Sequence, residues 1–311
     1  MTKNNPTVSV VIPTYNRAML LPRVIQSVLN QTFKDFELII VDDSSIDNTQ
    51  EVIKSFEDER IRYIRHEKNK GGSATRNTGI KVAQGEYIGL LDDDDEWLPE
   101  KIEKQVNKFK SLSDEFGVVY SGFSYVSEEK GKIVSNIIPT LRGRLYKSLL
   151  KRCIVGSPTP LIKRSCFQKV GFFDETLPSC QDWDMWIRIS KCYGFDFVPD
   201  VLAKHYVHGA QVSIDLNAKI VARQKLMEKY WVDLSQNSQA HSVLLNRLGI
   251  LCSLAGDYIK ARKYFFASVK KGSFLTGNYI HLFLSMLLPR VHRVILKKYF
   301  ITNINGIIFY Y

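Results

Sequence analysis

Four consecutive aspartates, Asp92–Asp95, are the residues of this chain best suited to chemistry. They follow the apolar segment Tyr87–Leu91, which has the composition of a buried strand, and helical spacing resumes after Pro99. The carboxylates should therefore lie at the carboxyl end of a strand, where open α/β sheets bind ligands. Because clustered carboxylates repel one another, they favour a hard cation, Mg²⁺ or Mn²⁺, held together with substrate phosphates. A solvated acidic turn is the alternative interpretation of the four acids taken alone.

Two further polar loops follow apolar strands earlier in the chain. Val8–Ile12 ends at Pro13 and leads into Thr14–Arg17, and Phe36–Val41 leads into Asp42–Ser45. Apolar spacing predicts helices between the strands, and a third strand at 61–64. This β-α-β-α alternation predicts a doubly wound, mostly parallel sheet, with loops 13–17, 42–45 and 92–95 side by side.

The elements after residue 115 are less regular. The sequence predicts strands at 117–120 and 123–126, a basic helix over 143–152, and an edge strand at 159–162 because of Pro160. A helix is expected to begin near Gln181, with the Asp182 carboxylate favoured by the free N–H groups of the first turn. Taken alone, this segment favours a capped core helix over a functional site.

Charge divides the chain into two parts. Residues 1–215 carry 29 basic and 29 acidic side chains, so the whole excess of +11 lies in residues 216–311. The length of 311 residues fits about two domains. We therefore expect an α/β domain over 1–215, with a nucleotide half (1–115) and an acceptor half (116–215), and a basic helical region over 216–311.

The last helices combine an apolar segment, Tyr279–Leu288, with cations that follow it. Ten apolar residues are too few for a transmembrane helix, but beside a basic helix they can lie on an anionic membrane surface. The alternative is a helix that packs on the catalytic domain with its basic face in water. Nucleic-acid binding is disfavoured, because the cations alternate with Leu and Ile and no recognised fold signature is present.

Five cysteines show neither paired nor CxxC spacing, which fits a reducing cytosol, and the first residues lack an apolar signal region. We expect a cytoplasmic protein, peripheral on the inner face of the plasma membrane.

Several motifs in order resemble one family. They are Val8–Arg17, Val41–Ser45, Gly72–Gly79, Asp92–Asp95, Gly171–Glu175 and Gln181–Asp184. Over residues 7–213 the chain resembles glycosyltransferase family 2, of the bacterial surface-polysaccharide type. The resemblance implies a GT-A fold with a C-terminal α-helical extension, and inverting transfer of a sugar from a nucleotide-sugar donor, usually UDP-linked, in the presence of Mn²⁺ or Mg²⁺.

The resemblance also assigns roles to individual residues. Those implied for the nucleotide and diphosphate are Pro13, Thr14, Tyr15, Arg17, Asp43, Arg76, Asp92 and Asp93. Asp94 would be the direct metal ligand, joined by Asp92 and His208, and Asp182 would be the catalytic base. The chain has Gln181 where the family commonly has Glu, which bears on acceptor choice. An exposed helix arginine and a structural histidine are the alternatives for Arg76 and His208.

Two other functions fit parts of the pattern. A nucleotidyltransferase shares the sheet and the metal, but would carry a glycine-rich basic loop where this chain has Pro13–Arg17. A non-catalytic scaffold could use the C-terminal helices alone, but it would not need intact aspartates. The preferred acceptor is a saccharide or lipid-linked saccharide.

Overall fold

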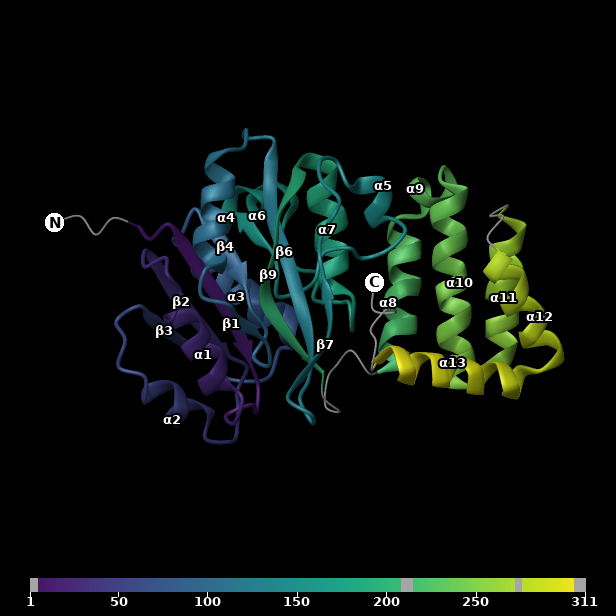
Figure 1. Cartoon of the computed structure of the whole chain (residues 1–311), viewed down its shortest axis with the longest axis horizontal. Helices are drawn as coiled ribbons and strands as arrows, with labels where there is room; N and C mark the ends of the chain where they lie inside the picture. Colours follow the sequence, from purple (N-terminus) through teal and green to yellow (C-terminus); the bar gives the residue numbers. More distant parts are fainter. Residues whose placement is uncertain (1–4, 208–214, 272–275, 305–311) are drawn as a thin grey trace. The chain divides into compact units, whose positions relative to one another are not determined.

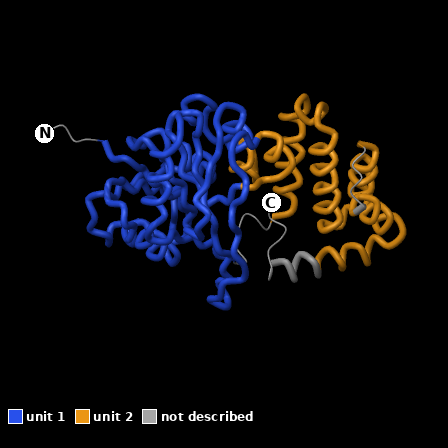
Figure 2. The backbone as a smooth tube through the Cα atoms, turned by 45° about the horizontal axis from the view of Figure 1, so that its top comes forward, with its two compact units in different colours: residues 1–145, 155–175, 185–207 blue, residues 146–154, 176–184, 208–311 orange. Residues whose placement is uncertain are grey.

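The structure, a computed structural model, describes residues 5–207, 215–271 and 276–304. The chain divides into two compact units (Figure 2). Unit 1 comprises residues 1–145, 155–175 and 185–207, and unit 2 comprises residues 146–154, 176–184 and 208–311. Two short segments that precede residue 208 thus belong to the helical unit.

Unit 1 is built on one nine-stranded sheet (Figure 1). Its strands are β1 (Val8–Thr14), β2 (Phe36–Asp42), β3 (Ile61–Arg65), β4 (Tyr87–Leu90), β5 (Glu96–Trp97), β6 (Phe116–Ser127), β7 (Lys132–Ile137), β8 (Leu161–Lys163) and β9 (Gly194–Val207). The spatial order is β3-β2-β1-β4-β8-β6-β9-β5, and β7 pairs with β6.

The first four long strands are parallel, as the alternating pattern predicts. β1 pairs with β2 on one side and β4 on the other, and β2 pairs with β3, all in the parallel sense. All seven residues of β1 are buried, which explains why it has an apolar sequence rather than an alternating one. The carboxyl ends of β1, β2 and β4 therefore meet at one edge of the sheet.

Helices that connect the strands pack against this sheet. They are α1 (Leu21–Leu29), α2 (Thr49–Lys54), α3 (Gly72–Val82), α4 (Lys101–Lys110) and α6 (Arg164–Val170). α3 packs on β1 and β2. It begins after Gly71, whose φ of 88° lies in the left-handed region that glycine tolerates.

The sheet beyond β4 differs from the sequence prediction in three ways. β8 hydrogen-bonds to β4 and to β6, both antiparallel, so it is an interior strand and the edge assignment was wrong. Pro160 is tolerated because it lies just before the strand begins. Residues 116–127 form one strand whose pairing with β9 shifts register around Gly122, so the glycine marks a bulge and not a break. The two-residue β5 has no counterpart in the prediction.

Unit 2 contains the C-terminal helices expected from the change in composition. They are α8 (Leu216–Lys229), α9 (Trp231–Ser235), α10 (Ser238–Ala255), α11 (Tyr258–Lys270), α12 (Thr276–Leu287) and α13 (Pro289–Ile304). Unit 2 also holds α5 (Tyr146–Leu149), shorter than the helix expected over 143–152, and the first turn of α7 (Gln181–Cys192). The α/β class with a helical extension is confirmed.

The core of unit 2 forms where α10 and α11 meet. Ala261, Phe265 and Cys252 are buried there together with Leu296 of α13. A Cβ atom added at Gly249 would come within 2.5 Å of the Phe265 ring, so this glycine sets how closely the two helices approach. α10 ends at Gly256, a left-handed cap with φ of 91°.

Candidate active site

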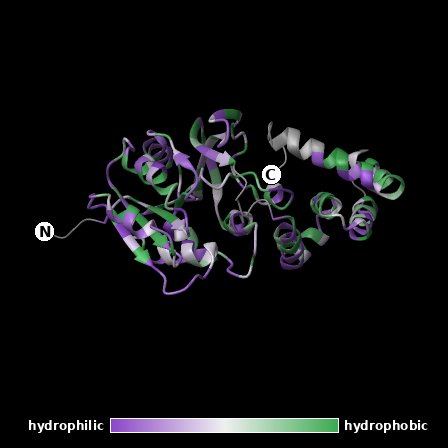
Figure 3. Ribbon diagram, turned by 90° about the horizontal axis from the view of Figure 1, so that it is seen from below, coloured by the Kyte–Doolittle hydropathy of each residue, from purple (hydrophilic) through white to green (hydrophobic). Residues whose placement is uncertain are grey.

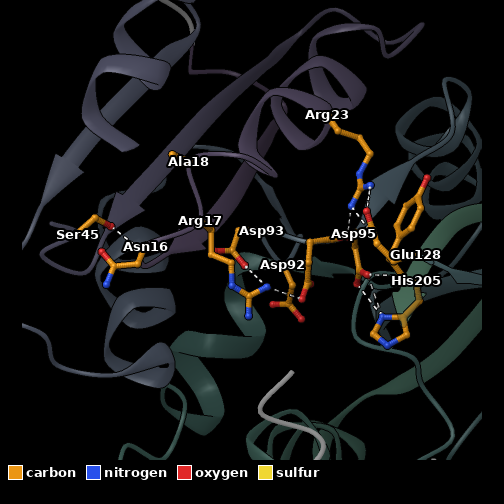
Figure 4. A network of polar contacts seen from close by, with 12 residues as sticks. Asn16, Arg17, Ala18, Arg23, Ser45, Asp92, Asp93, Asp95, Glu128 and His205 are labelled. Atoms are coloured by element: carbon orange, nitrogen blue, oxygen red, sulfur yellow. Dashed lines mark hydrogen bonds and ion pairs between the residues drawn. The ribbon is translucent and has the colours of Figure 1, made fainter. Parts of the chain in front are cut away.

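The three loops expected to lie together do so. The Asn16 N–H donates to the Ser45 hydroxyl at 2.9 Å (Figure 4). The Ile46 N–H donates to the Asn16 side-chain oxygen at 2.8 Å. Asn16 and Ser44 adopt positive φ angles of 51° and 70°. Non-glycine residues in this conformation are uncommon and cluster at functional sites. Loops 13–17 and 42–45 are thus fixed to each other by side-chain bonds.

Two arginines from different elements hold the aspartate loop. Arg17 donates from Nη1 to Asp94 Oδ2 at 2.9 Å, and the same nitrogen lies 3.9 Å from Asp93 Oδ1. Arg76 of α3 forms an ion pair with Asp92. Figure 4 shows the Arg17 guanidinium and the Asp92 and Asp93 carboxylates turned toward one another. The structure therefore brings together five residues that the sequence implicated: Arg17, Arg76, Asp92, Asp93 and Asp94.

The carboxyl groups of the loop differ in their electrostatics. Burial raises the pKa of Asp93 to about 7, and the charge of Asp94 acts in the same direction. Burial alone would also raise the pKa of Asp92, but the charge of Arg76 outweighs it and holds that pKa below its usual range. Added positive charge would stabilise Asp93 as a carboxylate. Such a loop favours binding of a cation.

Asp95 has a different set of partners, which the sequence reasoning missed. Its carboxylate accepts from the Tyr206 N–H at 3.1 Å and contacts His205 Nδ1 at 3.0 Å (Figure 4). Burial alone would lower the pKa of His205, but the Asp95 charge outweighs it and raises that pKa to about 9. The Asp95 charge thus favours the protonated form of His205, and their contact ties the end of β9 to the aspartate loop. The feature of the sequence that could have indicated this role is the position of His205 near the carboxyl end of a strand.

Arg23 of α1 completes this side of the loop. Its Nη2 donates to the Asp94 carbonyl oxygen at 3.0 Å, and its Nη1 pairs with Glu128 at 2.8 Å. The guanidinium also lies 3.7 Å from the centre of the Tyr206 ring, a cation–π contact. Helical periodicity gave no reason to single out Arg23, because the polar face of an amphipathic helix is expected to be exposed.

Asp43 orders the loop that leads into α3. Its carboxylate accepts from the backbone N–H groups of Lys70 at 2.8 Å and Gly71 at 2.7 Å, and contacts His66 Nδ1 at 2.7 Å. Asp43 is buried, whereas the neighbouring Tyr15 is 44% exposed and presents a ring to solvent. Pro13 and Thr14 are the last two residues of β1, immediately before Tyr15, and both are buried.

Asn77 connects two of the motifs that the sequence analysis identified. Its amide donates to the Phe173 carbonyl oxygen at 2.9 Å and to Glu175 at 2.8 Å, and its own oxygen accepts from the Phe173 N–H at 2.8 Å. The segment Gly72–Gly79 is therefore locked to Gly171–Glu175.

Asp182 lies in unit 2, in the first turn of α7, where it is half-buried. Its Oδ1 accepts from the Trp183 N–H at 2.8 Å. The neighbouring Asp184 is fully buried and accepts a hydrogen bond from the Tyr230 hydroxyl at 2.7 Å. It also forms an ion pair with Lys229, with 2.9 Å between Nζ and Oδ1. Of the two acids, Asp184 has the structural role. His208 lies outside the described residues.

The donor set suits a hard cation. Within the described residues no three or more His, Cys, Asp or Glu side chains are arranged as a metal site. Mg²⁺ and Mn²⁺ need fewer, since one or two carboxylates complete their shell with waters and substrate phosphates. Asp92 and Asp94 supply carboxylate oxygens on one loop, where burial and then the charge of Asp94 raise the pKa of Asp93. The residues present therefore fit such a cation.

Comparison with known proteins agrees with this geometry. A family model described as Glycosyl transferase family 2 matches residues 9–171. A glycosyltransferase of Methanocaldococcus jannaschii is 33% identical over 245 residues, which cover 76% of this chain and 82% of the relative. WcaA of Escherichia coli, a putative colanic acid biosynthesis glycosyl transferase, is 36% identical over 200 residues, covering 62% and 69%. Matches to three Rickettsia glycosyltransferases span only 35%, 31% and 66% of those proteins.

Solved structures share the fold at low sequence identity. TarS 1–349 of S. aureus in complex with UDP-GlcNAc superposes with a TM-score of 0.62 at 16% identity, covering 96% of this chain and 92% of that one. The mannosyltransferase PcManGT from Pyrobaculum calidifontis, in complex with GDP-Man and Mn²⁺, gives 0.60 at 17% identity, with coverage of 98% and 87%. The fold is therefore GT-A, as the motifs predict.

Proposed function

The chain belongs to glycosyltransferase family 2, and from this premise we propose that it transfers a sugar from a UDP-type nucleotide-sugar donor to a saccharide or lipid-linked saccharide acceptor, with inversion at the anomeric carbon. The observation that carries the proposal is the meeting of Arg17 and Arg76 with Asp92–Asp94 at the carboxyl ends of β1 and β4. At this edge of the sheet the arginines can bind the anionic diphosphate and the aspartates can bind the cation that accompanies it.

The nucleotide would bind over loops 13–17 and 42–45. Tyr15 presents an exposed ring on which a base can stack. Asp43, whose carboxylate accepts from Lys70 and Gly71, holds the adjacent backbone in place and offers the remaining lone pairs of its oxygens to a base N–H. UDP-GlcNAc in the TarS complex supports a uridine donor.

Asp94 and Asp92 would hold Mn²⁺ or Mg²⁺, with His208 as a further candidate ligand. When bound, the cation supplies Lewis-acid stabilisation of the charge that develops on the leaving diphosphate. For Asp94 to bind the cation through Oδ2, the Arg17 guanidinium must release that oxygen. The donor phosphates then provide the guanidinium with a new anionic partner. Arg76 would make the same exchange from Asp92. The two arginines thus change partners within the site instead of losing them.

The sugar acceptor requires a base. Its hydroxyl oxygen attacks the anomeric carbon, the bond from that carbon to the diphosphate oxygen breaks, and the leaving group takes the electron pair. The hydroxyl proton passes to the Asp182 carboxylate, which the Gln181–Asp184 motif identifies as the base. Such assistance contributes about 10²- to 10⁴-fold in rate. Attack on the face opposite the leaving group inverts the configuration.

We place the reaction in the cytoplasm, at the inner face of the plasma membrane. The five cysteines are all free, which suits a reducing compartment. The names of TuaG, a putative teichuronic acid biosynthesis glycosyltransferase of Bacillus subtilis, and of WcaA support a cell-surface polysaccharide as the product.

The direct test is a panel of sugar nucleotides, each with Mn²⁺, Mg²⁺ or chelator. A specific donor should raise the melting temperature of the protein only with metal present, since a ligand that binds the folded state stabilises it by mass action. The matching donor should then be hydrolysed slowly or transferred to an added acceptor, with release of nucleoside diphosphate. In a parallel assay with nucleoside triphosphates and sugar 1-phosphates, release of pyrophosphate would identify a nucleotidyltransferase and overturn the proposal.

A further inference from the structure

Helix α12 turns its apolar side outward. Tyr279, Ile280, Phe283, Met286 and Leu287 are each between 49% and 62% exposed. The neighbouring α13 continues this surface with Val291, Val294 and Ile295, which are 48%, 63% and 49% exposed. In a helix of a water-soluble bundle these positions are normally polar. The outward residues of α12 and α13, together with Leu288 between them, are called the α12–α13 face below.

The inward side of α12 carries polar residues beside Leu282, which packs against the core of unit 2. Asn278 is 3% exposed and its amide donates to the Ser242 hydroxyl at 3.1 Å. Ser285 is 1% exposed. His281 Nδ1 contacts His292 Nε2 of α13 at 3.0 Å and stacks on Phe265 of α11. The orientation of α12 is therefore fixed by polar contacts that keep its apolar side in solvent.

The charges in this part of the sequence have one sign. Residues 258–311 contain nine Lys and Arg residues and no Asp or Glu. Arg290 and Lys297 on α13 are exposed between the outward apolar residues. Figure 3 shows hydrophilic and hydrophobic residues alternating along the described part of α13, which runs crosswise to α10 and α11 (Figures 1 and 3).

We propose that the α12–α13 face is a membrane-docking surface that lies flat in the interface of an anionic lipid bilayer. Apolar side chains reach the acyl boundary while the flanking cations meet anionic headgroups. None of the helices in the described part of the chain has the length and apolar content needed to cross a bilayer, so the contact is peripheral.

The charge pattern separates this partner from a second copy of the chain. A symmetric dimer through the same face would bring two sets of uncompensated cations together, which is unfavourable. An anionic lipid surface neutralises them. The inference concerns unit 2 alone, so it can fail or succeed independently of the proposed transfer reaction.

The test is flotation of the purified full chain with vesicles of phosphatidylcholine alone or mixed with phosphatidylglycerol. Wild type should bind the mixed vesicles, less at high salt, and bind phosphatidylcholine weakly. Ile280→Ser with Leu287→Ser should lower the partition coefficient roughly tenfold or more, because two apolar side chains leave the interface. Arg290→Gln with Lys297→Gln should lower it by roughly thirtyfold, from about 1 kcal/mol per cation.

A matched control removes the same number of exposed apolar side chains from unit 1. Ile133 and Ile138 are 60% and 46% exposed, and Ile133→Ser with Ile138→Ser should bind vesicles as wild type does. Failure of wild type to bind mixed vesicles at low salt overturns the proposal. The proposal is also overturned if the Ile280/Leu287 variant binds mixed vesicles as well as wild type does. It is overturned, too, if light scattering shows that wild type is a dimer and that this variant is a monomer.

Discussion

Arg17 and Asp94 form an ion pair with 2.9 Å between Nη1 and Oδ2, so the carboxylate assigned to the metal and an arginine assigned to the diphosphate are already partners in the ligand-free chain. The pair satisfies both charges before the donor arrives. It also means that donor and metal are expected to bind together, because the metal competes with Arg17 for Asp94 while the diphosphate offers Arg17 another anionic partner.

We expect Asp94→Asn to reduce transfer by about 10²- to 10³-fold, because an electrostatic stabiliser of the leaving group is lost. Metal-dependent thermal stabilisation by the donor should disappear as well. The control is Asp114→Asn, an exposed carboxylate of unit 1 that pairs with Lys163 away from the loop. Full activity of the wild type in excess chelator would contradict the metal role.

Asp182 and Asp184 are two residues apart on α7, and we expect their substitution to affect different properties, catalysis for Asp182 and stability for Asp184. Asp182→Asn is expected to lower transfer by about 10²- to 10⁴-fold while donor binding and melting temperature persist. Asp184→Asn should instead lower stability by about 1–3 kcal/mol, because it weakens the buried bonds to Tyr230 and Lys229. Turnover, donor-induced thermal shift and unfolding midpoint separate the two. An Asp182→Asn enzyme with wild-type turnover would remove that residue from the mechanism.

Unit 2 should lose stability in acid through His292. Burial, followed by repulsion from His281, lowers the pKa of His292 to about 4, against an ordinary value near 6.5. Below the ordinary value the unfolded chain binds the proton more readily, so stability is lost as pH falls from about 6.5 toward about 4. The loss is on the order of 2–3 kcal/mol. Thermal midpoints measured across this range should fall for the wild type and fall less for His292→Gln. Equal slopes would exclude His292 as the cause.

Two glycines of unit 2 should respond oppositely to the same substitution. Gly249→Ala places a methyl group within 2.5 Å of the Phe265 ring and should cost about 1–3 kcal/mol by overpacking. Gly277→Ala, on α12, meets nothing within 4 Å and should be neutral or stabilising by up to about 1 kcal/mol. Urea unfolding of both variants tests the packing of α10 on α11. A neutral Gly249→Ala would show that the helices can move apart at little cost.

The parallel half of the sheet could be predicted because its strands are buried on both faces and so have continuous apolar sequences. β1, β2 and β4 also end in polar loops, and this placed Asp92–Asp94 and Arg17 correctly beside one another. The half of the sheet beyond β4, which mixes parallel and antiparallel pairs, was harder, since pairing there depends on partners distant in sequence. β8 has only three residues, and its position between β4 and β6 follows from the sheet and not from its own composition.

The part of the site formed by long-range pairing was missed for the same reason. His205 and Tyr206 reach Asp95 across 110 and 111 residues of sequence. Arg23 and Glu128 are 105 residues apart. Each of these residues is ordinary within its own segment, and only the fold makes them neighbours. The roles assigned to Asp43, Asp182 and the other residues that the family resemblance implicated remain predictions, and the Asp94 and Asp182 variants above address two of them.

The inward polar contacts of α12 carry a consequence for how this helix acquires its orientation. Rotating α12 by half a turn about its own axis would hide the outward side chains and satisfy the hydrophobic effect in water. The Asn278 bond to Ser242 and the contact between His281 and His292 oppose that rotation. They keep the apolar side chains of the α12–α13 face in water, which is unfavourable until a membrane surface covers them. Asn278→Leu should therefore raise the solubility of the protein in aqueous buffer and weaken its binding to anionic vesicles.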